Sequence, residues 1–365
     1  MTGPDVAVIG GGIVGCAVAA FTAEAGARVR LYERERVAAG ASGRNSGIVQ
    51  HPLDEDLVEL FDATVALYRQ LGHGFSLPPE PAGVLVLGRR ADALEPTREA
   101  LARRFPVLGA ERLGGAALHA AEPGLAGDLA AYRLETGFPV PPAAATEAFA
   151  ARARAAGADV REGAAAQPAL GVGRVAGVAH EGRVEPAGSV VVAAGPWTAA
   201  LVDPAGAWRP IVPLWGVNVE LRLRRPPRHA LEQAGVEDLS TVGERPGSIF
   251  SLVTHRGASA LGSTFLPERP DAAALAPGLV ERGARFVPAI AEAPVVSVRA
   301  CARPQAVDGR PLLGPAAGVD GLFLAAGHGP WGISLGPASA RLVADAALGR
   351  PVAIPAALDA RRLGP

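Results

Sequence analysis

The stretch Val6-Ala7-Val8-Ile9-Gly10-Gly11-Gly12-Ile13-Val14-Gly15 decides the fold. An apolar run typical of a strand leads into the spacing Gly-x-Gly-x-x-Gly, and a segment typical of a helix follows. A second apolar run, residues 27–32, ends at Glu33. A dinucleotide-binding βαβ unit requires this order of strand, glycine turn, helix, strand and acid. We therefore predict that the chain binds a dinucleotide.

Each part of this motif has a physical role. Gly10 lets the chain turn sharply, Gly12 leaves room for a pyrophosphate, and Gly15 lets the helix pack close to the sheet. The helix N-terminus offers free N–H groups and partial positive charge to the phosphates. Glu33 is expected to accept hydrogen bonds from ribose hydroxyls. The alternative is a purely structural turn, because a chain with 46 glycines produces such spacings by chance.

Composition limits the class of protein. The 365 residues are 49% hydrophobic, which is enough for a large core and one to three domains. A net charge of −1 indicates neither a nucleic-acid nor an anionic-membrane partner. No apolar run approaches the roughly 18 to 20 residues of a transmembrane span. Because the chain enters a strand almost at once, without a basic and cleavable apolar leader, we expect a cytoplasmic protein.

Cysteine and lysine usage excludes several kinds of site. Cys16 and Cys301 are the two cysteines, so a disulfide framework is excluded and a reducing compartment fits. They are too few for a cysteine-based zinc or iron–sulfur site, and we predict no metal. The chain has no lysine, which excludes a lysine Schiff base and a Walker-type phosphate loop.

Two kinds of apolar run follow along the chain. Residues 189–197 and 321–327 include continuous apolar runs that end at glycine, typical of strands buried on both faces of a parallel sheet. Residues 217–223 alternate apolar and polar, as does part of the run near Phe250 and Leu252, which is typical of an antiparallel sheet. We further predict helices at about 54–71, 91–104, 146–156 and 332–348, a strand at 82–88 and an irregular loop at 37–48.

The order of these segments predicts an α/β fold with an insertion. Parallel-type segments occur at the start, middle and end of the chain. We therefore predict a Rossmann-type dinucleotide domain assembled from three pieces, residues 1–78, 141–205 and 301–365. An inserted α+β domain with an antiparallel sheet, residues 79–140 and 206–300, is expected to bind the substrate.

Five stretches along nearly the whole chain carry a resemblance to a known family. They are residues 8–15, 41–47, 190–197, 303–314 and 327–333. In this order and spacing they resemble the flavin-dependent amine oxidoreductases of the D-amino-acid oxidase, glycine oxidase and sarcosine oxidase group. The most similar members are the bacterial D-amino-acid dehydrogenase-like proteins.

The resemblance implies that the dinucleotide is FAD rather than NAD, and we favour non-covalent binding over a covalent link through Cys301. It implies that the loop 42–47 lines the isoalloxazine ring and that Gly195 lies near the cofactor. It also implies that residues 327–333 direct a helix N-terminus at the flavin pyrimidine, where reduced flavin carries negative charge. The predicted cofactor contacts are Gly10, Gly12, Ile13, Val14, Gly15, Glu33, Arg34, Ser42, Arg44, Asn45, Ser46, Gly47, Ala194, Gly195, Trp197, Gly327, His328, Gly329, Gly332 and Ile333.

The resemblance also implies substrate contacts. Arg303 is expected to bind the substrate carboxylate, because a guanidinium fork matches a carboxylate through two parallel hydrogen bonds. Phe250 matches a position at which the glycine oxidase branch carries a tyrosine near the substrate, and core packing is the alternative. His51 and His328 are candidate pocket and catalytic residues, and the alternative for each is a helix cap or a surface position. Arg310 is expected to be solvated.

Cys301 lies near the offset at which the sarcosine oxidase branch carries a cysteine bonded covalently to FAD. The alternative is a small buried residue, which is common for cysteine. That branch also uses a lysine near flavin N5 in its reaction with oxygen, and this chain has none.

The resemblance implies oxidation of a small amino acid or amine: a D-amino acid, glycine or an N-methyl amino acid. Hydride passes from the α-carbon to flavin N5, and the imine hydrolyses to a 2-oxo acid and ammonia. One alternative is an FAD-dependent 2-hydroxy-acid dehydrogenase, with His51 or His328 as the base. Another is a non-catalytic flavin-binding subunit or redox sensor. Oxygen and another electron acceptor both remain open, as do the oligomeric state and the substrate side chain.

Overall fold

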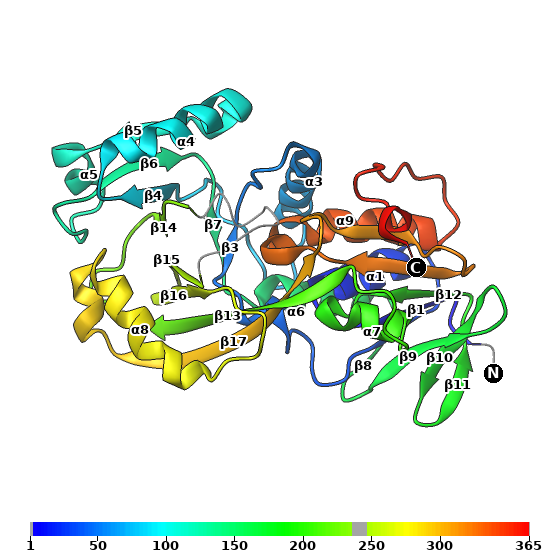
Figure 1. Ribbon diagram of the computed structural model, residues 1–365. Coiled ribbons are helices and arrows are strands. Elements are labelled where there is room, and N and C mark those ends of the chain that lie inside the picture. Colours follow the sequence, from blue (N-terminus) through cyan, green and yellow to red (C-terminus); the bar gives the residue numbers. More distant parts are fainter. Residues whose placement is uncertain (1–2, 236–246, 365) are drawn as a thin grey trace.

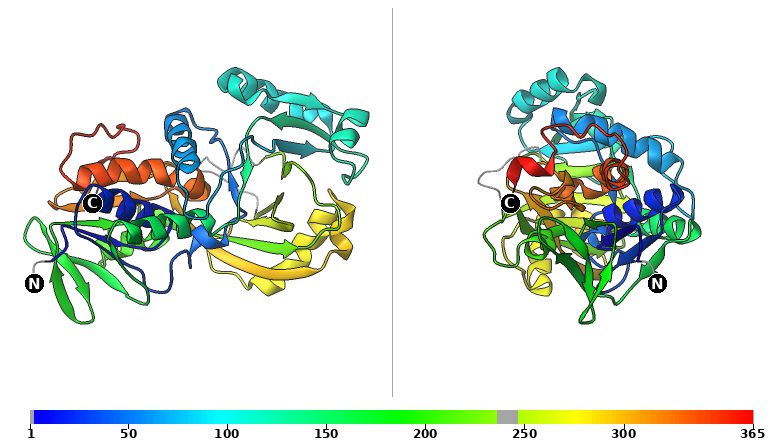
Figure 2. Two further views of the ribbon diagram at one scale, coloured as in Figure 1. Left: turned by 180° about the vertical axis from the view of Figure 1, so that it is seen from behind. Right: turned by 90° about the vertical axis from the view of Figure 1, so that its right-hand side faces the viewer.

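The computed structural model describes residues 3–235 and 247–364. Two sheets lie side by side along the long axis of the molecule, each with its own helices (Figure 1). Both termini lie at the end formed by the six-stranded sheet, and the eight-stranded sheet forms the other end (Figure 2).

The six-stranded sheet brings together the start, middle and end of the chain. β1 (Val6–Ile9) lies between β12 (Ser189–Val192) and β2 (Val29–Tyr32), and pairs in parallel with both. The continuous apolar runs predicted as buried strands form this centre. The sheet order is β18 (Leu312–Pro315), β19 (Leu322–Ala326), β12, β1, β2 and β8 (Asp159–Arg161), and only the β18–β19 pair is antiparallel among these. The predicted Rossmann-type sheet is therefore confirmed.

Helices cover one face of this sheet. α1 (Ile13–Glu24) packs between α6 (Ala144–Ala155) and α9 (Gly332–Ala347), and α3 (Val58–Arg69) packs on α9. Nearly every residue of α1 is buried, because its alanine-rich sequence lets neighbouring helices approach from several sides. On the other face lie α7 (Thr198–Val202) and a small sheet of β9 (Ala166–Leu170), β10 (Val175–His180) and β11 (Arg183–Pro186).

The eight-stranded sheet is mostly antiparallel. Its order is β17 (Val295–Ala306), β13 (Ile211–Leu221), β16 (Ala258–Thr264), β15 (Ser248–His255), β14 (Ala230–Gln233), β4 (Val84–Gly88), β6 (Ala130–Leu134) and β5 (Glu111–Leu113), with β14 and β4 parallel.

Separate cores lie on the two faces of this sheet. α8 (Ala272–Ala284) packs over β13, β15, β16 and β17, and α4 (Ala91–Arg104) packs over β4 and β6. Short helices lie beside these elements: α5 (Gly115–Ala121) contacts β6, η2 (Pro106–Leu108) contacts α4, and η5 (Pro288–Glu292) contacts α8. Another short helix, η7 (Ala360–Leu363), contacts β18 near the C-terminus.

The structure corrects the predicted irregular loop at 37–48. It contains one helical turn, α2 (Ala41–Arg44), and the first residue of β3 (Ile48–Val49), which pairs with β7 (Phe138–Pro139). Asn45 holds the end of the turn, since its Nδ2 donates to the carbonyls of Ala41 (3.1 Å) and Ser42 (2.8 Å). A single turn of small and polar residues has no apolar periodicity from which to predict it.

Other predicted elements differ mainly at their ends. The predicted helix at 54–71 begins as η1 (Glu55–Leu57) and continues as α3. The predicted domain boundary at 300/301 falls inside β17, which pairs along its length with β13. The division into two domains stays a prediction. Among residues 3–235 and 247–364, no helix combines the length and apolar character that a membrane crossing needs.

Candidate active site

A cavity of about 880 Å³ extends from the glycine turn after β1 to the strand β17. Its walls come from both large sheets, so it lies where the two halves of the molecule meet. One end is lined mainly by main-chain turns and helix N-termini, and the other end by side chains on β13 to β17.

The glycine turn forms the first end. Gly10 has a φ of +115°, and a Cβ there would overlap the carbonyl of Ala193, so the turn requires glycine. The N-cap residue of α1 is Gly12, which has no side chain to cap the helix. The N–H of Ile13, in the first turn, donates to Ser42 Oγ at 3.0 Å. The Glu33 carboxylate accepts from the Gly11 N–H at 2.6 Å and lines the cavity beside the turn.

Arg34 and Trp197 form the outer wall of this end. The Arg34 guanidinium carbon lies 3.8 Å from the centre of the Trp197 ring, which is a cation–π contact. Trp197 belongs to η3 (Gly195–Trp197), which follows β12, and Arg34 follows β2, so the pair comes from the two strands that flank β1.

The N-terminus of α9 opens into the middle of the cavity. Gly329 of η6 (Gly329–Trp331), together with Gly332 and Ile333 of α9, lines the wall. A helix N-terminus carries partial positive charge, which suits a group that becomes anionic.

His328 lies just before this helix and also lines the cavity. It is 2% exposed, and its Nε2 has no hydrogen-bond partner within the described residues. Burial lowers its pKa to about 4, so its imidazole is neutral at pH 7.

Arg303 of β17 lies at the second end. Its Nη1 donates to the Thr264 carbonyl at 3.0 Å, and its Nη2 donates to Ser263 Oγ at 2.5 Å. The guanidinium carbon is 4.7 Å from the centre of the Phe265 ring. A Cβ at Gly216 would overlap the guanidinium, so this glycine makes room for it. Neutral oxygens and an aromatic ring therefore fix a cationic fork at the cavity wall.

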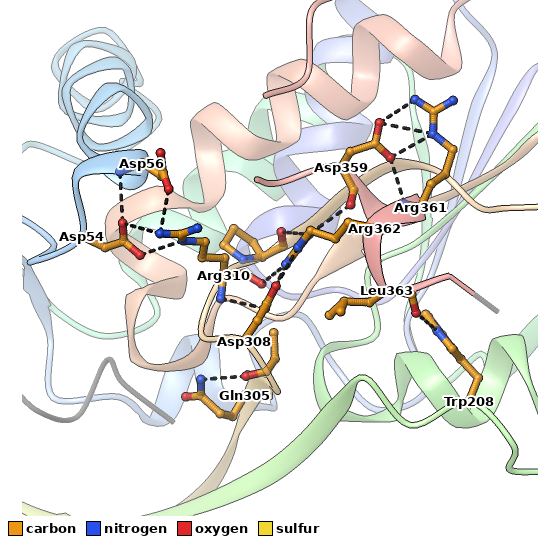
Figure 3. A network of polar contacts seen from close by, with 12 residues as sticks. Asp54, Asp56, Trp208, Gln305, Asp308, Arg310, Asp359, Arg361, Arg362 and Leu363 are labelled. Carbon is orange, nitrogen blue, oxygen red and sulfur yellow. Dashed lines mark hydrogen bonds and ion pairs between the residues drawn. The ribbon is translucent and has the colours of Figure 1, made fainter. Parts of the chain in front are cut away.

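The residues that follow Arg303 have a structural role (Figure 3). Arg310 pairs with Asp54 at 2.8 Å and with Asp56 at 2.7 Å, and Asp308 pairs with Arg362 at 2.7 Å. Arg310 is 34% exposed, as a partly solvated residue would be, but it is also ion-paired on the surface. These ion pairs tie the turn after β17 to the start of α3 and to the C-terminal segment.

Cys301 lines the cavity with a buried thiol. Burial raises its pKa, and its Sγ lies 3.8 Å from the Arg44 carbonyl. A protonated thiol is a poor nucleophile, so its environment favours the structural alternative over a covalent bond to flavin.

The structure corrects two predicted site residues. Phe250 is fully buried and stacks on Phe286 with ring centres 4.3 Å apart, in the core under α8. Its neighbour Ser251 lines the cavity instead, because successive residues of a strand face opposite sides. His51 is 4% exposed and lies outside this cavity, with its ring edge-on to Phe61. Burial lowers the pKa of His51.

Three of the predicted cofactor glycines support the cavity without lining it. A Cβ at Gly15 would overlap the Gly10 carbonyl, so Gly15 allows close packing of α1 on the turn. Gly47 and Gly327 have φ values of +80° and +85° and shape the turns beside β3 and β19. The other predicted cofactor residues line the cavity, and their contact with the cofactor stays a prediction: Gly10, Gly12, Ile13, Val14, Glu33, Arg34, Ser42, Arg44, Asn45, Ser46, Ala194, Gly195, Trp197, His328, Gly329, Gly332 and Ile333.

Several cavity residues were not predicted. Gln50 lies one position before the predicted His51, and Ser251 one position after the predicted Phe250. The alternation of strand faces was the available signal for Ser251. Three further lining residues come from paired strands: Trp215, Asn218 and Glu232. The sequence does not show how these strands pair, so it could not predict that these residues face the cavity.

These residues fit FAD. Two helix N-termini and a glycine turn that excludes side chains suit a pyrophosphate and an anionic ring. Glu33 lies where a ribose hydroxyl donor is expected. Within residues 3–235 and 247–364, no group of three or more His, Cys, Asp and Glu side chains is arranged to hold a metal ion.

Comparisons with known proteins agree with this geometry. A family model described as DAO, FAD dependent oxidoreductase, matches residues 5–346. Glycine oxidase from Pseudomonas aeruginosa is 30% identical over 374 residues, covering 96% of this chain and 97% of that protein. Glycine oxidase from Bacillus licheniformis is 28% identical over 367 residues, covering 95% and 94%.

Solved structures show the same fold. The crystal structure of glycine oxidase from Geobacillus kaustophilus superposes with a TM-score of 0.85 at 26% identity, covering 99% of both chains. The iminodiacetate oxidase from Chelativorans sp. BNC1, at 24% identity, has a TM-score of 0.83 over 99% of this chain and 98% of that one.

Proposed function

Because this chain belongs to the DAO family of FAD-dependent oxidoreductases, we propose that it oxidises a small amino acid or amine. The substrate class is a D-amino acid, glycine or an N-methyl amino acid. Relatives that are glycine oxidases and span nearly the whole chain support this class. The observation that carries the proposal is the Arg303 guanidinium, which is fixed in the same cavity as the glycine turn.

The chain's own residues hold and orient the reactants. We assign the pyrophosphate to the N-terminus of α1, the ribose to Glu33 and the flavin ring to residues 42–46 and the N-terminus of α9. Arg303 holds the substrate carboxylate by two parallel hydrogen bonds, which directs the α-carbon toward the ring site. Bound FAD supplies the redox chemistry, because its ring accepts a hydride equivalent from the α-carbon.

No strong general base is needed for this reaction. The substrate amine must be neutral when the α-hydrogen leaves, and the resulting imine reacts with water to give a 2-oxo acid and ammonia, or methylamine where the substrate is an N-methyl amino acid. His328 lines the cavity beside the N-terminus of α9, and burial lowers its pKa to about 4, so it can accept a hydrogen bond but holds a proton weakly. We include oxygen or another acceptor as oxidant, and a cytoplasmic location, in the proposal.

Anaerobic mixing tests the proposal. The holoprotein is mixed with D-alanine, glycine, N-methylglycine, L-alanine and D-lactate, and the visible flavin band is followed. We expect at least one of the three proposed substrates to bleach the band, with one 2-oxo acid formed per flavin. Bleaching by D-lactate alone, or by none of the compounds, would overturn it.

A further inference from the structure

Asn218 of β13 is a buried amide in the wall of the cavity. It is 2% exposed, and its Nδ2 donates to the Arg44 carbonyl at 3.3 Å. Because a carbonyl oxygen can only accept a hydrogen bond, this contact fixes which end of the amide carries the nitrogen. The Oδ1 atom therefore points away from Arg44, and it has no hydrogen-bond partner among the residues that the structure describes.

An unpaired buried acceptor is unusual, because it costs free energy until a donor reaches it. His328 Nε2 and Trp331 Nε1 likewise have no hydrogen-bond partner within residues 3–235 and 247–364, and both residues line the same cavity. Three such atoms around one cavity indicate that its ligands bring polar groups. Asn218 Oδ1 is an acceptor, so the group that it receives must carry an N–H or O–H donor.

On one side, Asn218 adjoins the turn that the proposed function assigns to the flavin ring. Arg44, whose carbonyl accepts from the Asn218 amide, is the last residue of α2. Cys301 of the neighbouring strand β17 also contacts this carbonyl, with its Sγ at 3.8 Å. The amide is therefore held between the sheet and the wall of the ring site.

On the other side, the acceptor adjoins the Arg303 guanidinium. A Cβ at Gly262 of β16 would overlap Asn218 Oδ1, so this oxygen lies over Gly262. The next two residues of β16, Ser263 and Thr264, accept hydrogen bonds from Arg303. Two residues of a strand rise by about 7 Å. An α-amino acid that forms a hydrogen bond of about 2.9 Å at each end spans this distance.

We propose that Asn218 Oδ1 accepts a hydrogen bond from the substrate amine, and that Asn218 thereby selects molecules with an N–H donor on the α-carbon. The carboxylate and the amine of an α-amino acid are bonded to the same carbon, so a carboxylate at Arg303 brings the amine toward Asn218. The contact fixes rotation about the bond between the α-carbon and nitrogen, and Asn218 takes no proton itself. This inference rests on the proposed function, since it takes Arg303 as the partner of the carboxylate.

Binding of two unreactive probes tests this contact without any oxidation. α-Aminoisobutyrate carries a carboxylate and an amine but no α-hydrogen, and pivalate has a methyl group in place of the amine. We expect the wild-type holoprotein to bind α-aminoisobutyrate about 10-fold more tightly than pivalate by titration calorimetry. Asn218→Leu keeps the size of the side chain without the acceptor, so it should lose this preference while its affinity for pivalate stays unchanged.

Two further variants complete the test. Glu220→Gln is the matched control, because Glu220 lies two residues further along β13, outside the cavity, and pairs with Arg299. It should keep the preference for α-aminoisobutyrate. Asn218→Ala introduces no new bulk, so it repeats the measurement if Asn218→Leu does not fold.

The outcomes separate this inference from the proposed function. Equal binding of the two probes by the wild-type protein, or a preference that survives removal of the Asn218 amide, would overturn the contact. An equal loss of affinity for both probes in the Asn218 variants would also overturn it, because that is the result of a purely structural role. If the preference disappears only in these variants, the contact stands even where no amino acid bleaches the flavin.

Discussion

The two ends of the cavity are built in different ways. At the nucleotide end, the surface is mainly backbone: a glycine turn, two helix N-termini and short segments that follow parallel strands. At the substrate end, the surface is made of side chains on antiparallel strands, among them Arg303, Asn218, Ser251 and Glu232. At the first end, the turn admits no side chain at Gly10, where a Cβ would overlap the Ala193 carbonyl, whereas polar and charged side chains line the second end.

This difference separates what binds the cofactor from what selects the substrate. A backbone site is common to many chains because it depends on glycine spacing and helix ends. A site made of side chains can change its substrate through single substitutions, so the function depends on these residues rather than on the fold.

The largest effect is expected from a substitution that disrupts the nucleotide end of the cavity. Gly15→Ala places a methyl group in overlap with the Gly10 carbonyl, so the turn and α1 must separate. We expect a loss of more than about 3 kcal/mol of unfolding free energy and loss of FAD, measured by chemical denaturation and by the flavin-to-protein absorbance ratio. Gly278→Ala is the control, because a Cβ at this helical position meets no atom within 4 Å. Retention of FAD by Gly15→Ala would contradict the backbone description.

The next largest effect is expected from a substitution that alters the substrate end of the cavity and leaves the nucleotide end intact. Arg303→Gln removes the cation while Ser263 and Thr264 stay in place. We expect kcat/KM to fall by about 10² to 10³, mostly through KM, with normal FAD content. Arg310→Gln serves as the control, because its ion pairs with Asp54 and Asp56 lie away from the cavity, and it should lower the melting temperature without this loss. A similar fall of kcat/KM in both variants would refute the assigned role.

A third prediction concerns His328, where the two ends meet. Its pKa falls from 6.5 to about 4 in the folded protein because the imidazole is buried. Between pH 6.5 and 4 the unfolded chain binds more protons than the folded one, so unfolding free energy decreases as pH falls through this window. The loss is about 3 kcal/mol for this residue. Denaturation of wild type and His328→Asn across this range checks it, and equal pH slopes would be the contrary result.

The smallest effect is expected for Cys301→Ala, which we predict does not change how flavin is held. Burial raises the pKa of the Cys301 thiol, which disfavours the nucleophilic thiolate, so we expect flavin to be held without a covalent bond. Acid precipitation should release all flavin to the supernatant from both wild type and Cys301→Ala. A coloured wild-type pellet that becomes colourless in the variant would show a covalent link.

The sequence predicts the nucleotide end well and the substrate end poorly, for a physical reason. Gly10, Gly12 and Glu33 act through local spacing, and local spacing is present in the sequence. Phe250 and Ser251 differ by one position, yet they face opposite sides of the sheet, and their assignment requires the register. The position of Glu232 at the cavity wall depends on pairing between β14 and β15, which no local pattern shows.

The central claim is that Arg303 and the glycine turn open into one cavity, so that a bound carboxylate lies against bound flavin. Titration of the holoprotein with caproate, followed by the visible absorption spectrum of the flavin, tests it most directly. We predict a saturable spectral change in the wild-type protein that is absent in Arg303→Gln at the same concentrations. Binding of caproate by calorimetry without any spectral change, or an equal change in Arg303→Gln, would contradict it.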